Sequence, residues 1–348
     1  PRLGPDGWWY IACGLRGGSV KLGSHYTQRA DSDDQPASLE IGSRDIRFNP
    51  ERGILQAVTG PAQFGLTFDT LGFRLFCSNR NPGVQVVFEQ RELRGNPLVG
   101  LVAATKDFIP AGSASQVYPQ VDAWTTSNLH AGQFTAACGV FCRSSSTNVG
   151  SPLTSDGTVF EEIFICEPTG SLVKRVLTKR DAAMLSLIDD GRIPSETEWL
   201  SSQDPWFRPV NIALAPGDNI MVVDMHRAVI EHPHWVPKEL KNRPDERWGN
   251  QAGRIYVVGT GADQFQQTLR QLRQTPLNSR SSAELALLLA DDDPWVRQIA
   301  GRLLVEREAT AVVPTLWRHT QNSDLSLAAR IHSLQLAACL NQELPEPA

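Results

Sequence analysis

The feature that most constrains this chain is a hairpin pattern that recurs along its N-terminal part. In the clearest copy, an apolar run at 210–214 meets the turn Pro216-Gly-Asp-Asn219, and a second apolar run at 220–223 follows at once. Two β-prone runs joined by a Gly/Asp/Asn turn predict an antiparallel hairpin. Further copies of this pattern are found at residues 4–12, 45–57 and 64–77.

Self-similar hairpins spaced by tens of residues are typical of a β-propeller or of another all-β array. We therefore predict that residues 1–258 form a mainly β domain, a β-propeller. An ordinary β-sandwich with Gly-rich turns is the alternative, and the propeller is favoured because the copies share a motif as well as turn residues. Since Pro1 already falls inside a hairpin, we expect the chain to be truncated and the ring of blades to be incomplete.

The pattern changes to a helical one near residue 279. Ser281-Ser-Ala-Glu284 is a capping box in front of an apolar run, and Asp291-Asp-Asp-Pro294 is expected to end that helix and start the next. An Asp and an Arg six residues apart recur at a distance of 33 residues, as Asp291/Arg297 and Asp324/Arg330. Paired amphipathic helices at this period predict HEAT-like (ARM-type) repeats over 279–342, after a linker at 259–278. Within that linker, the segment 262–273 is Gln-rich, and a short helix is the alternative there.

Charge and hydropathy exclude several classes of protein. The 348 residues carry a formal net charge of −5, which gives no basic footprint for nucleic acid. No run approaches the 18 consecutive apolar residues of a transmembrane helix. We expect no signal peptide within these residues, which begin at Pro1; an export signal would belong to the missing start of the chain.

Cysteine spacing excludes some cofactors. The chain has six cysteines but no Cys-x-x-Cys, so it has no zinc knuckle and no c-type haem motif. Cys138 and Cys166 lie at the ends of two neighbouring strand-like runs and are the best candidates for a disulfide, which an oxidising compartment would permit. The alternative is that all six are small buried apolar residues.

Ionisable residues crowd the exit of the strand that ends at Val223. They are Asp224, His226, Arg227, Glu231, His232 and His234, followed by Trp235. Strand exits and the loops after them are where β proteins commonly carry function. We therefore take this exit as the candidate functional region.

Several motifs, in this order along the chain, resemble one bacterial family. They are Gly4-Pro-Asp-Gly-Trp-Trp-Tyr10, Gln63-Phe-Gly-Leu-Thr-Phe-Asp69, Cys77-Ser-Asn-Arg-Asn-Pro82, Gln133-Phe-Thr-Ala-Ala-Cys-Gly139, Cys166-Glu-Pro-Thr-Gly-Ser-Leu-Val-Lys-Arg175, Asp204-Pro-Trp-Phe-Arg-Pro-Val210 and Val223-Asp-Met-His-Arg-Ala-Val-Ile-Glu-His-Pro233. Over residues 1–340 the chain resembles the membrane-bound dehydrogenases of planctomycete-type bacteria. Those proteins look like sorbosone/glucose dehydrogenase-type propellers followed by HEAT-like repeats, often with a c-type haem domain. No haem motif is found in this chain.

The resemblance implies a quinone-dependent oxidoreductase that acts on a sugar or polyol in the periplasm or cell envelope. It implies pyrroloquinoline quinone and calcium as cofactors. The residue types suit catalysis by His130, His232 and Arg208, because histidine titrates near working pH. Arg208 and Arg227, with Asp224, are the candidates for holding the cofactor, because the arginine fork binds carboxylates.

Structural roles are the alternative for each of these residues. Asp224 and Arg227 would form an ion pair at the strand exit, His232 would cap a loop, and Arg208 would tie blades together. No acidic loop has the spacing of a known calcium motif, so no metal ligands are assigned. The alternative function is a non-catalytic propeller–HEAT scaffold that binds a carbohydrate, or a protein partner through its helical repeats. An enzyme requires His and Arg to converge on one central cavity, whereas a scaffold requires only a broad face.

Overall fold

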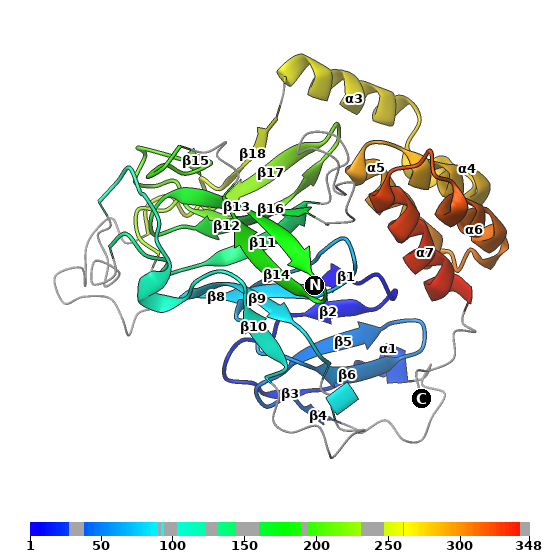
Figure 1. Cartoon of the computed structure of the whole chain (residues 1–348), viewed down its shortest axis with the longest axis horizontal. Helices are drawn as coiled ribbons and strands as arrows, with labels where there is room; N and C mark the ends of the chain where they lie inside the picture. Colours follow the sequence, from blue (N-terminus) through cyan, green and yellow to red (C-terminus); the bar gives the residue numbers. More distant parts are fainter. Residues whose placement is uncertain are drawn as a thin grey trace.

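The computed structural model covers the whole chain and describes residues 1–27, 38–89, 92–93, 103–122, 131–143, 160–189, 194–230, 247–259 and 261–341. Within these residues the chain is mainly β up to Val258 and helical from Ala262 onward (Figure 1). All pairings between the described strands are antiparallel. The predicted change from a β domain to a helical region is confirmed.

Four antiparallel sheets follow one another along the chain. The first contains, in this order across the sheet, β1 (Arg2–Leu3), β2 (Trp9–Ile11), β5 (Asp45–Asn49) and β6 (Ile54–Val58). The second contains, in this order across the sheet, β7 (Phe64–Phe68), β8 (Arg74–Ser78), β9 (Asn81–Val86) and β10 (Thr105–Asp107). The third contains β11 (Cys138–Arg143), β12 (Phe160–Glu167), β13 (Leu172–Asp181) and β14 (Met184–Ile188), with β15 (Leu200–Ser201) also paired to β13. The fourth contains β16 (Pro209–Ala215), β17 (Asn219–Asp224) and β18 (Arg254–Val258). A small β3 (Ser19–Val20) and β4 (Leu39–Glu40) pair and the short α1 (Ser24–Thr27) lie beside the first sheet (Figure 1).

The four predicted hairpins are all present. They are formed by β1–β2, β5–β6, β7–β8 and β16–β17. In the β16–β17 turn, Gly217 and Asp218 both have positive φ, 76° and 58°. Positive φ at both central residues is the geometry that matches the right-handed twist of the paired strands, and Gly and Asp tolerate it.

The first strands of neighbouring sheets pack against one another. β7 contacts β11, and β11 contacts β16. The register of each of these strands shifts near its start, where Gly65 and Gly139 lie in β7 and β11. A Cβ on Gly65 would lie 2.6 Å from the Val140 nitrogen, and one on Gly139 would lie 2.7 Å from the Asn211 Cα. Glycine is therefore required where one sheet passes closest to the next.

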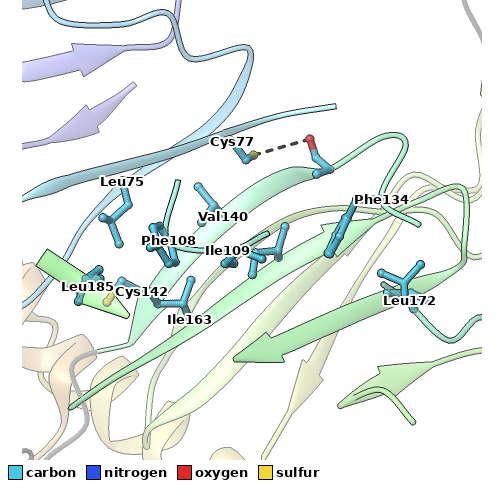
Figure 2. Packing of buried hydrophobic residues seen from close by; sticks show 13 residues of the cluster. Leu75, Cys77, Phe108, Ile109, Phe134, Val140, Cys142, Ile163, Leu172 and Leu185 are labelled. Atoms are coloured by element: carbon cyan, nitrogen blue, oxygen red, sulfur yellow. Dashed lines mark hydrogen bonds between the residues drawn. The ribbon is translucent and has the colours of Figure 1, made fainter. Parts of the chain in front are cut away.

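The apolar core lies between consecutive sheets. Leu75 of the second sheet and Val140 and Ile163 of the third are fully buried in one cluster with Phe134 (Figure 2). A second cluster joins the third sheet to the fourth, and it includes Phe141, Phe164, Ile212 and Val222. Burial of these side chains is the main source of stability for the β part, because removal of apolar surface from water drives folding.

The C-terminal part consists of α3 (Ala262–Gln274), α4 (Ser282–Leu287), α5 (Pro294–Glu306), α6 (Val313–Gln321) and α7 (Leu327–Asn341). The predicted capping box is present, since the Ser281 side chain accepts from the Glu284 N–H and Glu284 bonds back to Ser281. Asp293 caps α5, with Pro294 in its first turn. Of the two alternatives for 262–273, a linker or a short helix, the structure has the helix α3, in which no residue is buried.

The helices pack against the β part. The Gly217 N–H donates to Asp293 Oδ2 over 2.6 Å, so the β16–β17 turn is joined to the N-terminus of α5. Gln335 of α7 donates to the Thr70 carbonyl over 3.4 Å. Among the described residues, no helix has the length and apolar character needed to cross a membrane.

Candidate functional site

Asp224, at the end of β17, is buried and organises the strand exit. Its Oδ1 accepts hydrogen bonds from the N–H groups of Arg208 and His226, each over 2.8 Å. Its Oδ2 pairs with Nε of Arg254, 3.1 Å away on β18. Arg208, proposed with Asp224 to hold a cofactor, therefore contacts Asp224 through its backbone N–H and not through its guanidinium.

The guanidinium of Arg208 is occupied by main-chain carbonyl groups. Nη1 donates to the carbonyls of Pro168 and Thr169, and Nε and Nη2 donate to those of Arg227 and Ala228. These bonds tie the β12–β13 turn to the segment after β17. The side chain is buried, and burial lowers the pKa of its guanidinium. With four N–H groups already bonded, Arg208 does not fit the role of a clamp for a quinone carboxylate.

Arg227 does not pair with Asp224. Its Nη1 donates to the Arg247 carbonyl over 3.4 Å, and its N–H donates to the Trp206 carbonyl over 3.0 Å. The predicted ion pair of Asp224 therefore forms with Arg254 instead. Register explains the difference, because Asp224 and Arg254 are directly opposite in the β17–β18 ladder.

Polar and aromatic side chains gather on the surface beside this exit. The rings of Trp206 and Trp248 lie 6.1 Å apart at 48°, and the ring of His226 lies 5.5 Å from that of Trp206. Arg254 contacts the His226 ring and lies 3.9 Å from the carboxylate of Asp204. We call these five residues the Trp206 platform. Trp248 is 53% exposed, so the platform opens to solvent.

Local backbone structure holds the platform together. His226 has φ 47°, a left-handed conformation, and the bond from its N–H to Asp224 closes an Asx turn. Trp206 is held similarly, because its N–H donates to Asp204 Oδ1 over 2.9 Å. The sequence placed His226 at the strand exit and Trp206 in a family motif, but it did not indicate that Trp248, Arg254 and Asp204 are their partners. Arg254 is brought there by the β17–β18 register, and Trp248 by the path of the chain between these strands.

The two histidines predicted to be catalytic, His130 and His232, lie outside the residues that the structure describes, as do Glu231, His234 and Trp235. Their catalytic role stays a prediction. Within the described part of the chain, no group of three or more His, Cys, Asp or Glu side chains is arranged to hold a metal ion.

The predicted disulfide partners face one another. Cys138 of β11 and Cys166 of β12 are directly opposite in the ladder, and both are free thiols. Burial raises the pKa of both thiols well above the ordinary value, so little thiolate is present at neutral pH. The disulfide stays a prediction for protein folded under oxidising conditions.

A cavity of about 190 Å³ lies where the sheets meet α5 and α7. Arg2, Phe68, Phe141 and Leu214, one from the first strand of each sheet, contribute to its wall. The opposite wall includes His332 of α7 and residues of α5. The first strands of all four sheets therefore contribute to the wall of one cavity, and residues of α5 and α7 line its other side.

Arg297 and His332 both line this cavity, but each is held by contacts within the protein. Nη1 of Arg297 donates to the carbonyls of Asp291 and Asp292, as the recurring Asp/Arg spacing suggested. His332 is packed against Gly301, where a Cβ would lie 2.7 Å from its Nε2. Burial, with a smaller effect of Arg297, lowers the pKa of His332 to about 4, so its ring is neutral at pH 7.

Two buried carboxyl groups lie near the cavity wall. Asp69 pairs with Arg180, and Glu161 accepts from the Thr70 N–H and hydroxyl, each over 3.0 Å, and from the Cys142 thiol. Burial raises the pKa of Asp69 to about 6. Burial and the nearby Asp69 charge raise the pKa of Glu161 to about 7. Glu161 therefore titrates near neutral pH, whereas Asp69 is mostly ionised at pH 7, and the bonds of both groups are to the protein itself.

A model of one protein family matches the whole of the β part. It describes a domain of unknown function, DUF7133, and matches residues 1–261, from β1 to the start of α3. No curated protein and no solved structure matches the chain significantly. Because the match covers more than half of the residues, the chain belongs to the DUF7133 family.

Proposed function

We propose that this chain is a non-catalytic scaffold, an incomplete β-propeller carrying HEAT-like repeats, that binds a carbohydrate on the Trp206 platform. Four consecutive antiparallel sheets with first strands around one cavity support the propeller. The capped starts of α4 and α5 and the buried Arg297 support the HEAT-like repeats.

The chemistry of the charged side chains favours a scaffold over a quinone enzyme. The resemblance assigns Arg208 to substrate and cofactor, but its guanidinium is bonded to four carbonyls. The central cavity, at about 190 Å³, is below the roughly 300–1,000 Å³ of small-molecule pockets.

The observation that carries the proposal is the pairing of a half-buried Trp206 with an exposed Trp248 beside an ionic cluster. The faces of Trp206 and Trp248 supply apolar area for the C–H face of a pyranose. Asp204, His226 and Arg254 surround them with hydrogen-bond donors and acceptors for hydroxyl groups. Exposed apolar patches rimmed by polar groups mark interaction sites. A carbohydrate also agrees with the sugar-related, cell-envelope family that the sequence resembles.

The test is titration calorimetry of the purified chain against a panel of neutral and acidic oligosaccharides. We expect Trp248→Ala to weaken binding of the best ligand by about tenfold or more, since loss of one stacking aromatic removes at least about 1.4 kcal/mol. Trp317→Ala is the matched control, because Trp317 is 37% exposed but lies on α6.

Two results would contradict the proposal. One is the loss of the predicted binding behaviour: no oligosaccharide binds, or Trp248→Ala binds the best ligand as tightly as the parent chain and Trp317→Ala do. The other is dye-linked sugar oxidation after addition of pyrroloquinoline quinone and Ca²⁺ that disappears in His232→Ala. The second result would establish the enzyme in place of the scaffold.

A further inference from the structure

The outer edge of β18 differs from the corresponding edges of the other sheets. In each of the other three sheets, a fourth strand pairs with the outer edge of the third strand. β6 pairs with β5, β10 with β9, and β14 with β13. Ile46, Val84 and Val173 in those third strands are buried. β18 is the third strand of its sheet, and no described strand pairs with its outer edge.

The side chains of β18 are exposed on both faces. Ile255 is 63% exposed, Tyr256 41% and Val257 40%. Because side chains alternate along a strand, Ile255 and Val257 lie on one face and Tyr256 on the other. Three consecutive large apolar residues are thus left in water, in a strand whose equivalents are buried.

Charges that commonly protect a free edge are missing from the centre of β18. Natural edge strands carry charged residues, Pro or bulges that prevent pairing with another chain. β10, the edge strand of the second sheet, follows this rule with exposed Lys106 and Asp107. The only charge in β18 is Arg254, and its Nε is paired with Asp224 of its own sheet.

The sequence of β18 is compatible with pairing to itself. In an antiparallel register centred on Tyr256, Ile255 is opposite Val257 of the second copy, and Arg254 is opposite Val258 of the second copy. Aliphatic residues then face each other across the strands, and no like charges are opposed. The surface is therefore self-complementary, as a two-fold interface requires.

We propose that two copies of this chain associate through their β18 edges, antiparallel and centred on Tyr256, to form one continuous sheet. Each copy supplies the strand that covers the other copy's β18. The pairing satisfies the outward backbone N–H and C=O groups of both edges and buries the aliphatic pairs between them. The two proposals share Arg254, which belongs to β18 and to the Trp206 platform, but they are tested separately because Tyr256 and Val257 are not platform residues.

Sedimentation velocity over a series of concentrations tests the proposal on the intact chain. We expect a concentration-dependent dimer, and we expect Val257→Lys to raise its dissociation constant about 30-fold, since the change enters the symmetric interface twice. Leu187→Lys is the matched control, because Leu187 is 39% exposed on β14, another edge strand. It should leave the dissociation constant unchanged.

A cross-link fixes the register independently of the lysine variants. We expect Tyr256→Cys to form a disulfide-linked dimer under mild oxidation, whereas Leu187→Cys does not. The proposal is overturned if the chain stays monomeric at every soluble concentration, if Leu187→Lys weakens the dimer as much as Val257→Lys, or if Tyr256→Cys gives no linked dimer.

Discussion

The carboxylate of Asp224 accepts a hydrogen bond from the N–H of Arg208 over 2.8 Å and so closes the open end of the β16–β17 hairpin. Asp224 is 1% exposed, and the same oxygen also accepts from the His226 N–H. The residue thus fixes both the strand exit and the turn that carries His226. Through these bonds Asp224 orders the turn that carries His226 and holds Arg254 of the platform.

Asp224→Ala should therefore lower stability. Removing the carboxylate leaves two N–H groups without their acceptor and Arg254 without its partner, and we expect a loss of about 2–3 kcal/mol in the free energy of unfolding. Urea denaturation measures it. Asp204→Ala, at a half-exposed carboxylate on the same platform, should change stability by less than about 0.5 kcal/mol. Equal effects of the two changes would contradict the structural role of Asp224.

Glu161 should make stability depend on pH. Its pKa is raised from 4.5 to about 7, so the folded protein holds this proton more tightly than the unfolded chain does. The resulting stabilisation is fully present below about pH 4.5 and is lost as pH rises to about 7. Glu161→Gln should flatten this decline, measured as the melting temperature between pH 4.5 and 8. Part of the decline should remain, because the pKa of Asp45 is also raised, to about 6. An unchanged slope in the variant would refute the assignment.

Gly139→Ala should destabilise the contact between the third and fourth sheets. The new Cβ would lie 2.7 Å from the Asn211 Cα, and φ at Gly139 is 57°. We expect a loss of about 2–4 kcal/mol from overpacking and backbone strain together. Gly14→Ala is the control, because Gly14 has φ 76° but open space around it, and it should cost only about 1 kcal/mol. The difference in unfolding free energy between the two variants isolates the close approach of the sheets.

Cys138 and Cys166 should form a disulfide when the chain folds in an oxidising compartment. Residues directly opposite in an antiparallel ladder have Cα atoms about 4.5–5.5 Å apart, which suits the bond. Peptide mapping without reduction would detect the linked peptides in protein exported to the periplasm. Alkylation of both thiols after denaturation of that protein would show that the pair stays reduced.

Local sequence signals determined much of the secondary structure. The turn Pro216–Asn219 needs only neighbouring residues to form, and so does the capping box at Ser281 and Glu284. The spacing of apolar residues likewise changes from a period of about 2, typical of strands, to about 3.6, typical of helices, and this change predicts where the sheets end and the helices begin. The sequence did not distinguish the helix α3 from a linker, because all of its residues are partly exposed and none belongs to a buried apolar face.

The tertiary structure alone decided which charges and rings meet. Asp224 pairs with Arg254 rather than Arg227, because the β17–β18 register brings residues 30 apart into opposition. The rings of Trp248 and Trp206 lie 6.1 Å apart although the two residues are far apart in the sequence. Hairpins and caps depend on residues a few positions apart, which the sequence specifies directly. The partners of buried carboxylates, the central cavity and the uncovered β18 edge depend on how whole sheets pack, which no local pattern encodes.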